Sequence, residues 1–136
     1  MRRLSGLIAV APALTLLAGC VAGPTAAPPP SAQAQLYLKY AGPPIDDFTY
    51  LGHYDGFKSL GGPYLVIWTT YTDAYLIKVR DPCIELPFTN AIGLTATAHT
   101  VNRRFDFVIV GQEHCRIGSI QRLDYQAMKQ AHVAGP

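Results

Sequence analysis

The stretch Tyr64-Leu65-Val66-Ile67-Trp68-Thr69-Thr70-Tyr71 is dense in β-branched and aromatic residues. Such residues suit a pleated surface, so a strand is predicted here. Residues 72–74 predict a turn, and residues 75–80 then resume with a period of two. In that second run one face carries Tyr75, Ile77 and Val79, and the other carries Lys78 and Arg80. The two runs together predict an antiparallel hairpin.

Further segments extend this pattern toward the C-terminus. Residues 91–99 and 105–110 predict the strands of a second hairpin, with Asn102-Arg103-Arg104 at its tip. In the second of these strands Asp106 is expected on a half-exposed side, opposite Phe105, Phe107 and Ile109. Residues 115–121 predict a last short strand. Asp124 can cap a short helix that ends near Val133.

No helical stretch of crossover length separates the predicted strands, which argues against a parallel α/β sheet. Instead, short strands joined by turns are typical of an antiparallel architecture. We therefore predict a mainly β fold, α+β at the margin. It is a small antiparallel sandwich or partly open barrel with a short C-terminal helix.

The N-terminus is built like a bacterial secretion signal. Arg2 and Arg3 supply a positive n-region, and residues 4–17 supply an apolar h-region that is too short for a mature membrane span. Leu17-Ala18-Gly19-Cys20 then resembles the lipobox of bacterial lipoproteins. The resemblance implies cleavage before Cys20 and a diacylglyceryl group on its thiol. It also implies a membrane partner, because more than one acyl chain anchors a protein stably.

After the lipobox, residues 21–35 are rich in proline, alanine and small polar residues, with a triple proline at Pro28 to Pro30. Such a segment cannot bury a core and favours an extended conformation. It therefore predicts a tether between the lipid and one folded domain. The predicted division is a signal at 1–19, a lipidated cysteine and tether at 20–35, and a single β-rich domain at 36–136.

The charge of the chain argues against nucleic acid as a partner. The whole chain has 11 basic and 9 acidic residues. Arg2 and Arg3 belong to the signal, so the part from Cys20 is formally neutral. A neutral domain gives no electrostatic reason to bind a polyanion, and the pair Arg103-Arg104 is too small to change this.

With Cys20 assigned to the lipid, Cys83 and Cys115 remain as an even pair. Two such cysteines in a small exported domain more often pair than stay free, so a disulfide is predicted. The competing interpretation is a metal site that uses both cysteines and His114. The chain lacks C-x-x-C and a histidine pair at ligand spacing, so no metal is expected.

Candidates for acid–base chemistry are few. Glu113-His114 is the most suggestive cluster, because a general base needs an orienting partner. Its polar turn context, residues 111–114, is more typical of a surface. His53 with Asp55 nearby is a weaker candidate. No G-x-S-x-G, H-E-x-x-H, P-loop or G-x-G-x-x-G motif is present, so no catalytic residue or cofactor is predicted and the enzyme question stays open, leaning toward no.

Aromatic residues are the remaining signal. If Tyr64, Trp68 and Tyr71 stand on an outer face, they form a binding surface for sugar rings or for an apolar patch of a partner. The alternative, which we favour, is that most of these rings fill the core of a small β domain.

Residues 45–124 also resemble a family of small, uncharacterised proteobacterial lipoproteins. The matching points are residues 75–79, Pro82-Cys83, residues 92–95, residues 106–110, and Cys115-Arg116-Ile117 followed by Ile120. In that pattern two cysteines bracket a hydrophobic β segment. The resemblance implies an exported, disulfide-bonded, strand-rich domain and carries no catalytic residues.

These observations favour a lipid-anchored envelope lipoprotein of unknown activity that acts as a non-enzymatic binding or interaction module. Its expected partner is an envelope protein or a polysaccharide. The alternative is a small envelope accessory enzyme that acts on cell-wall polysaccharide. Val21 stands where aspartate commonly signals inner-membrane retention in Gram-negative lipoproteins. The resemblance therefore implies the periplasmic face of the outer membrane.

Overall fold

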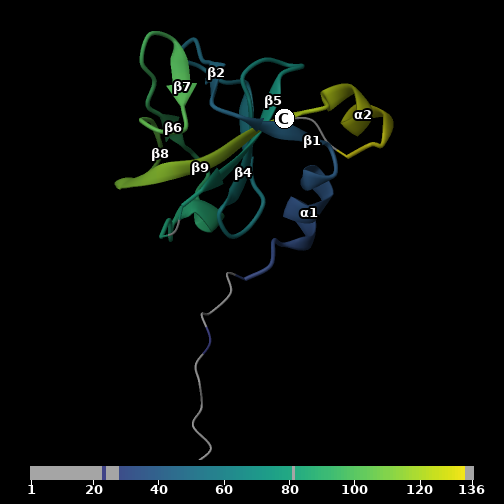
Figure 1. Ribbon diagram of the computed structural model, residues 1–136, viewed down its shortest axis with the longest axis horizontal. Helices are drawn as coiled ribbons and strands as arrows, with labels where there is room; N and C mark the ends of the chain where they lie inside the picture. The colour runs from purple at the N-terminus through teal and green to yellow at the C-terminus, as the bar shows by residue number, and fades with distance from the viewer. Residues whose placement is uncertain (1–22, 24–27, 81, 134–136) are drawn as a thin grey trace, which may run out of the picture.

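The computed structural model describes residues 23, 28–80 and 82–133 (Figure 1). The predicted signal, the lipobox with Cys20 and part of the tether lie outside the described residues. The elements follow in the order α1 (Ala32–Leu38), β1 (Ala41–Ile45), β2 (Asp47–Thr49), β3 (Gly56–Ser59), β4 (Tyr64–Trp68), β5 (Ala74–Val79), η1 (Leu86–Phe88), β6 (Gly93–Leu94), β7 (Thr100–Asn102), β8 (Phe107–Val110), β9 (Glu113–Leu123) and α2 (Tyr125–Gln130).

The hairpin predicted from residues 64–80 is confirmed as β4 and β5. The two strands pair antiparallel, with Leu65 opposite Ile77 and Trp68 opposite Ala74. Nearly every residue of both strands is buried, because the hairpin is covered on both faces. This double burial explains why its sequence is an almost continuous apolar run rather than a strict alternation.

Two hydrophobic clusters cover the two faces of the hairpin. Figure 1 shows α1 and α2 on one side of the sheet and β2, β6, β7 and β8 on the other. The barrel-side cluster consists of Phe48, Tyr50, Leu65, Ile67, Tyr75, Ile77, Val79, Cys83, Leu86, Ile92, Val101, Val108, Val110, Cys115, Ile117 and Ile120. The helix-side cluster consists of Ala34, Tyr37, Leu60, Val66, Trp68, Ala74, Leu76, Leu123, Tyr125 and Met128.

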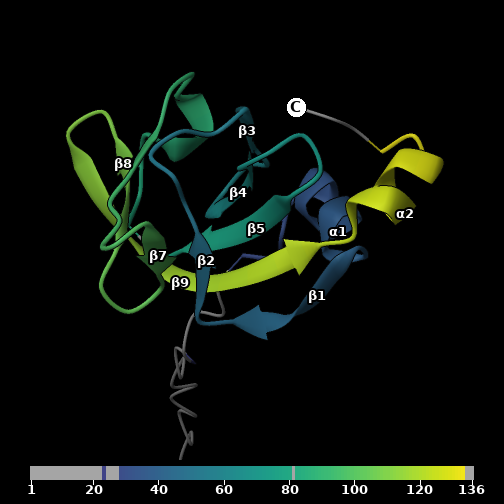
Figure 2. The ribbon, with the colours of Figure 1, turned by 90° about the horizontal axis from the view of Figure 1, so that it is seen from above.

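The long strand β9 joins the parts of the sheet (Figure 2). Its first residues pair with β8, and its later residues pair with β5 on one edge and with β1 on the other. The order β3-β4-β5-β9-β8-β6 curls into an antiparallel half-barrel that is followed by a short C-terminal helix. The predicted mainly β fold is therefore confirmed.

The second predicted hairpin forms only in part. β6 pairs with β8, but residues 95–99 leave the main sheet, and β7 pairs with β2 in a separate two-stranded sheet. Ala98 and His99 make the turn between Thr97 and Thr100 with φ values of 51° and 57°. Two consecutive residues in this left-handed region are unusual for residues other than glycine, so the period of two misled the strand prediction.

The prediction for Asp106 is wrong. Its side chain is only 6% exposed, because Val108 and Val110 face the core on the same side. The Asp106 carboxylate accepts hydrogen bonds from the Thr95 hydroxyl and from the Asn102 backbone N–H, each at 2.8 Å. These two donors satisfy the buried polar side chain of Asp106, whereas Phe105 on the other side is 74% exposed.

The predicted tether boundary at residue 35 is too late. Helix α1 already begins at Ala32, and Ala34 is fully buried. The Ser31 hydroxyl caps this helix by accepting a hydrogen bond from the Ala34 N–H, at 3.0 Å. The C-terminal helix is capped by Asp124 as predicted, but it ends at Gln130 instead of near Val133.

Candidate functional site

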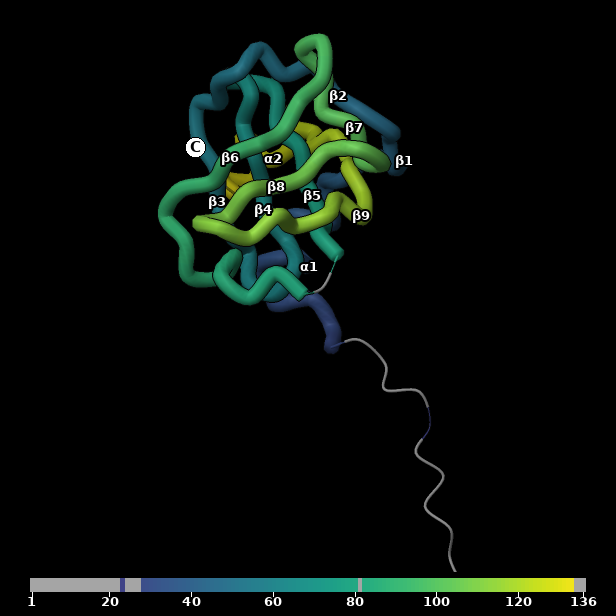
Figure 3. The backbone as a smooth tube through the Cα atoms, turned by 90° about the vertical axis from the view of Figure 1, so that its left-hand side faces the viewer, coloured from purple at the N-terminus to yellow at the C-terminus, as the bar shows by residue number. Residues whose placement is uncertain are grey.

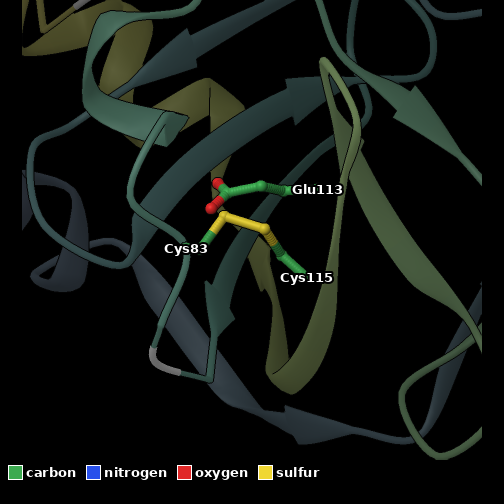
Figure 4. A group of neighbouring side chains, drawn as sticks. All are labelled: Cys83, Glu113 and Cys115. Carbon is green, nitrogen blue, oxygen red and sulfur yellow. A yellow bond between two sulfur atoms is a disulfide. The ribbon is translucent and has the colours of Figure 1, made fainter.

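Cys83 and Cys115 form the predicted disulfide, with their Cα atoms 5.6 Å apart (Figure 4). The Glu113 side chain lies beside the two sulfur atoms, and its ligand atom and theirs are all within 4.8 Å of one another. The sulfurs are bonded to each other, so they do not offer thiolates to a metal ion. His114, the third ligand of the competing metal interpretation, is not in this group.

Glu113 has a structural contact instead. Its carboxylate accepts a hydrogen bond from the Glu85 backbone N–H at 3.0 Å. The disulfide and this hydrogen bond together hold the segment after β5 against the start of β9. The predicted Glu113-His114 cluster is therefore divided, because the His114 ring lies edge-on to Phe107, with the ring centroids 6.0 Å apart.

The histidine candidates are dispersed in the structure. His53, His99, His114 and His132 are all exposed. Within residues 28–80 and 82–133, no histidine side chain makes a hydrogen bond or an ion pair with a carboxylate. The structure therefore brings together neither His53 with Asp55 nor His114 with a neighbouring acid.

The three aromatic candidates also separate. Trp68 is 0% exposed in the helix-side cluster, so it fits the favoured interpretation as a core ring and is not part of the possible binding surface. Its side chain points to the face that α1 and α2 cover, because β4 alternates between the two clusters. Tyr64 is half-buried under Lys78, whose Nζ lies 5.5 Å from the ring centroid. Only Tyr71, at 62% exposure, is available at the surface.

The Tyr71 ring contacts Tyr125, which lines a groove that sequence analysis did not identify. The groove has a volume of about 760 Å³ and is lined by residues 39–43, Thr72-Asp73 and residues 122–127. These segments are the start of β1, the β4–β5 turn, and the end of β9 with the first turn of α2. The groove therefore forms where three distant parts of the chain meet at one end of the sheet.

The polar residues of the groove are held in place. The Asp73 carboxylate accepts hydrogen bonds from the Thr70 hydroxyl, at 2.9 Å, and from the Arg122 guanidinium. Arg122 itself is largely exposed, so this ion pair adds little to stability. Its role is to orient a planar donor and an acceptor at the wall of the groove.

Tyr125 lines the groove, and Tyr71 packs against Tyr125 without being a lining residue itself. The Tyr71 and Tyr125 rings meet edge to face, with their centroids 5.9 Å apart. Desolvation, together with the neighbouring Tyr71 hydroxyl, raises the pKa of Tyr125 above its usual value. The Tyr125 phenol is therefore a neutral hydrogen-bonding group at neutral pH. The available chemistry is an exposed ring face beside paired polar groups, which suits binding rather than proton transfer.

No helix in residues 28–80 and 82–133 has the length and apolar character that a membrane span requires. No curated protein and no solved structure shows significant similarity to the chain. One family model spans nearly all of it, matching residues 1–135. The chain therefore belongs to the family of unknown function DUF6491.

Proposed function

We propose that this protein is a lipid-anchored envelope lipoprotein whose groove binds a saccharide chain. The anchor rests on the sequence Leu17-Ala18-Gly19-Cys20, with Cys20 as the lipidated residue. Val21 favours the periplasmic face of the outer membrane. The folded domain then acts as a binding module for envelope polysaccharide.

The observation that carries the binding proposal is the exposed Tyr71 ring, which packs against Tyr125 of the groove lining. Sugar rings stack on exposed aromatic faces through their C–H surfaces, and their hydroxyls need oriented donors and acceptors. The Asp73–Arg122 pair supplies both kinds of group next to the ring. The open shape of the groove supports an extended chain more than a single enclosed molecule.

The binding test uses calorimetric titration of the purified protein with soluble peptidoglycan glycan strands. Tyr71→Ala should weaken binding roughly two- to tenfold, as expected for one ring contact. Tyr71→Phe, which keeps the ring, should bind nearly as the wild type does. Phe105→Ala is the matched control, because Phe105 is an exposed ring that does not line the groove. This variant should bind the glycan strands as the wild type does.

Two outcomes would contradict the saccharide proposal. Binding that is unchanged in Tyr71→Ala would show that the groove is not the site. A lack of any saccharide binding, with the protein folded, would favour an envelope protein as the partner. The anchor has a separate test, since Cys20→Ser should abolish labelling by a fatty-acid probe in cells.

A further inference from the structure

Two exposed apolar side chains lie on the segment between β5 and β6. Ile84 is 70% exposed and Phe88 is 87% exposed, whereas Leu86 between them is fully buried. Isolated exposed apolar residues are common, but two on one short loop form a local apolar surface. We call residues 82–91 the apolar loop.

The apolar loop is held rigidly to the body of the protein. Cys83 is bonded to Cys115, the Glu85 N–H donates to Glu113, and Leu86 inserts into the barrel-side cluster. The loop is therefore fixed on both sides of Ile84 and just before Phe88. With the backbone fixed there, the Ile84 and Phe88 side chains cannot turn into the core. Their exposure is therefore built into the fold.

Basic residues lie next to this loop. Lys78 in β5 and Arg80 directly after this strand are exposed and line a shallow recess of about 460 Å³ together with Ser119. Glu85 is the acidic residue of the loop, but its carboxylate is turned back against Gly111, where a Cβ would lie 2.5 Å from it. Of these exposed charged residues, two are therefore basic and one is acidic.

The chain leaves the domain at this same end. The Ser31 hydroxyl, at the start of α1, donates to the Leu60 carbonyl, and Pro63 of the following turn accepts a hydrogen bond from the Val79 N–H at 2.9 Å. These contacts join the start of α1 to the end of β5. Figures 1 and 3 show the apolar loop at the end of the molecule from which the described chain leaves α1 toward its N-terminus.

Chain length sets how far this end can lie from the proposed anchor. Pro28 lies eight positions after Cys20 in the sequence. Such a length of chain spans at most roughly 29 Å even when fully extended. A lipid on Cys20 would therefore hold this end of the domain, rather than the groove end, near the membrane.

From these observations we infer that the apolar loop contacts a phospholipid surface. Ile84 and Phe88 enter the boundary between headgroups and acyl chains, and Lys78 and Arg80 face the phosphates of anionic lipids. The inference rests on the proposed anchor at Cys20. A protein partner for the loop is the alternative, and it is less favoured because the tether and the basic residues both point to the lipid surface.

The test uses the full lipidated protein in vesicles of phosphatidylethanolamine and phosphatidylglycerol that contain brominated lipid as a quencher. In Phe88→Trp the introduced indole should lose most of its fluorescence, because bromine quenches by contact. In Phe105→Trp, the matched exposed ring on the β7–β8 turn, the indole should not be quenched. Trp68 is fully buried in the structure and is unchanged in all variants, so it should give a constant background.

Charge is tested in the same system. Omitting phosphatidylglycerol should reduce quenching at position 88, and the double change Lys78→Gln with Arg80→Gln should remove that dependence on lipid charge. If the protein is lipidated and floats with the vesicles but the indole at 88 is not quenched, the inference is overturned while the anchor stands. If the fatty-acid probe does not label Cys20, both are overturned.

Discussion

The two faces of the β4–β5 hairpin are buried in different ways. On the barrel side, other strands and a disulfide between residues 32 positions apart close the cluster. On the helix side, α1 and α2 close it, and these have only 7 and 6 residues. Helices of that length are marginal alone, so they depend on their caps and on packing against the sheet. The comparison teaches that one hairpin can be the centre of two cores, one held covalently and one held by side-chain packing.

The largest effect is expected from truncating the hairpin on either face. Ile77→Ala on the barrel side and Leu76→Ala on the helix side should each lower the free energy of unfolding by about 3–5 kcal/mol. Both side chains are essentially fully buried. Urea unfolding measures both, with Arg104→Ala as an exposed control that should change stability by less than about 0.5 kcal/mol. A cost below about 1 kcal/mol for Leu76→Ala would show that the helix side is not a true core.

Removing the disulfide should lower the stability of the whole domain and loosen the barrel side most. Cys83→Ala with Cys115→Ala is expected to cost about 3–4 kcal/mol, since the cross-link closes a loop of about this length in the unfolded chain. Hydrogen exchange should increase in residues 82–91 more than in α2. The wild type should show no reactive thiol at these positions without reductant, and two reactive thiols there would contradict the disulfide.

Removing a helix cap should weaken only the helix side. Asp124→Ala loses the hydrogen bond from the Ala127 N–H, at 3.0 Å, and should cost about 1 kcal/mol. Ser31→Ala should cost more, up to about 2 kcal/mol, because Ser31 also donates to the Leu60 carbonyl. Thermal unfolding measures the loss, and Asp124→Ser, which can still cap, should recover most of it. Equal destabilisation by Asp124→Ala and Asp124→Ser would indicate that the cap is unimportant.

The smallest effect is expected at the Tyr37 hydroxyl, inside the helix-side cluster. This buried hydroxyl has no hydrogen-bond partner among the described residues, and burial raises its pKa. Tyr37→Phe removes an unsatisfied polar group and keeps the ring, so stability should be unchanged or rise by up to about 1 kcal/mol. Tyr37→Leu, which removes the ring, should destabilise. A clear loss in Tyr37→Phe would show that the hydroxyl is satisfied in solution.

The parts of the fold that could be predicted have strong local signals. The β-branched run of β4 and the period of two in β5 predicted the central hairpin, and Asp124 predicted the cap of α2. The Ser31 cap was also visible in the sequence, followed by alanine and glutamine with high helix propensity. The triple proline before it concealed α1, because composition averaged over residues 21–35 indicated a tether.

The candidate site was harder to predict, since its residues are distant in sequence. Arg122 meets Asp73 across 49 positions, and nothing local to either residue predicts the pair. Tyr71 was identified, but together with Trp68, which the helices cover. A count of aromatic residues cannot separate a buried ring from an exposed one when a strand is covered on both faces.

Taken alone, the sequence determined the antiparallel β class, the pairing of Cys83 with Cys115 and the short C-terminal helix. Each depends on local pattern or on counting, and needs no knowledge of distant neighbours. Only the tertiary structure decided which rings reach solvent, how Asp106 is satisfied inside the protein, and where the groove and the apolar loop lie. These depend on which segments meet in space, because burial and hydrogen bonding are set by neighbours that the curling of β9 brings together.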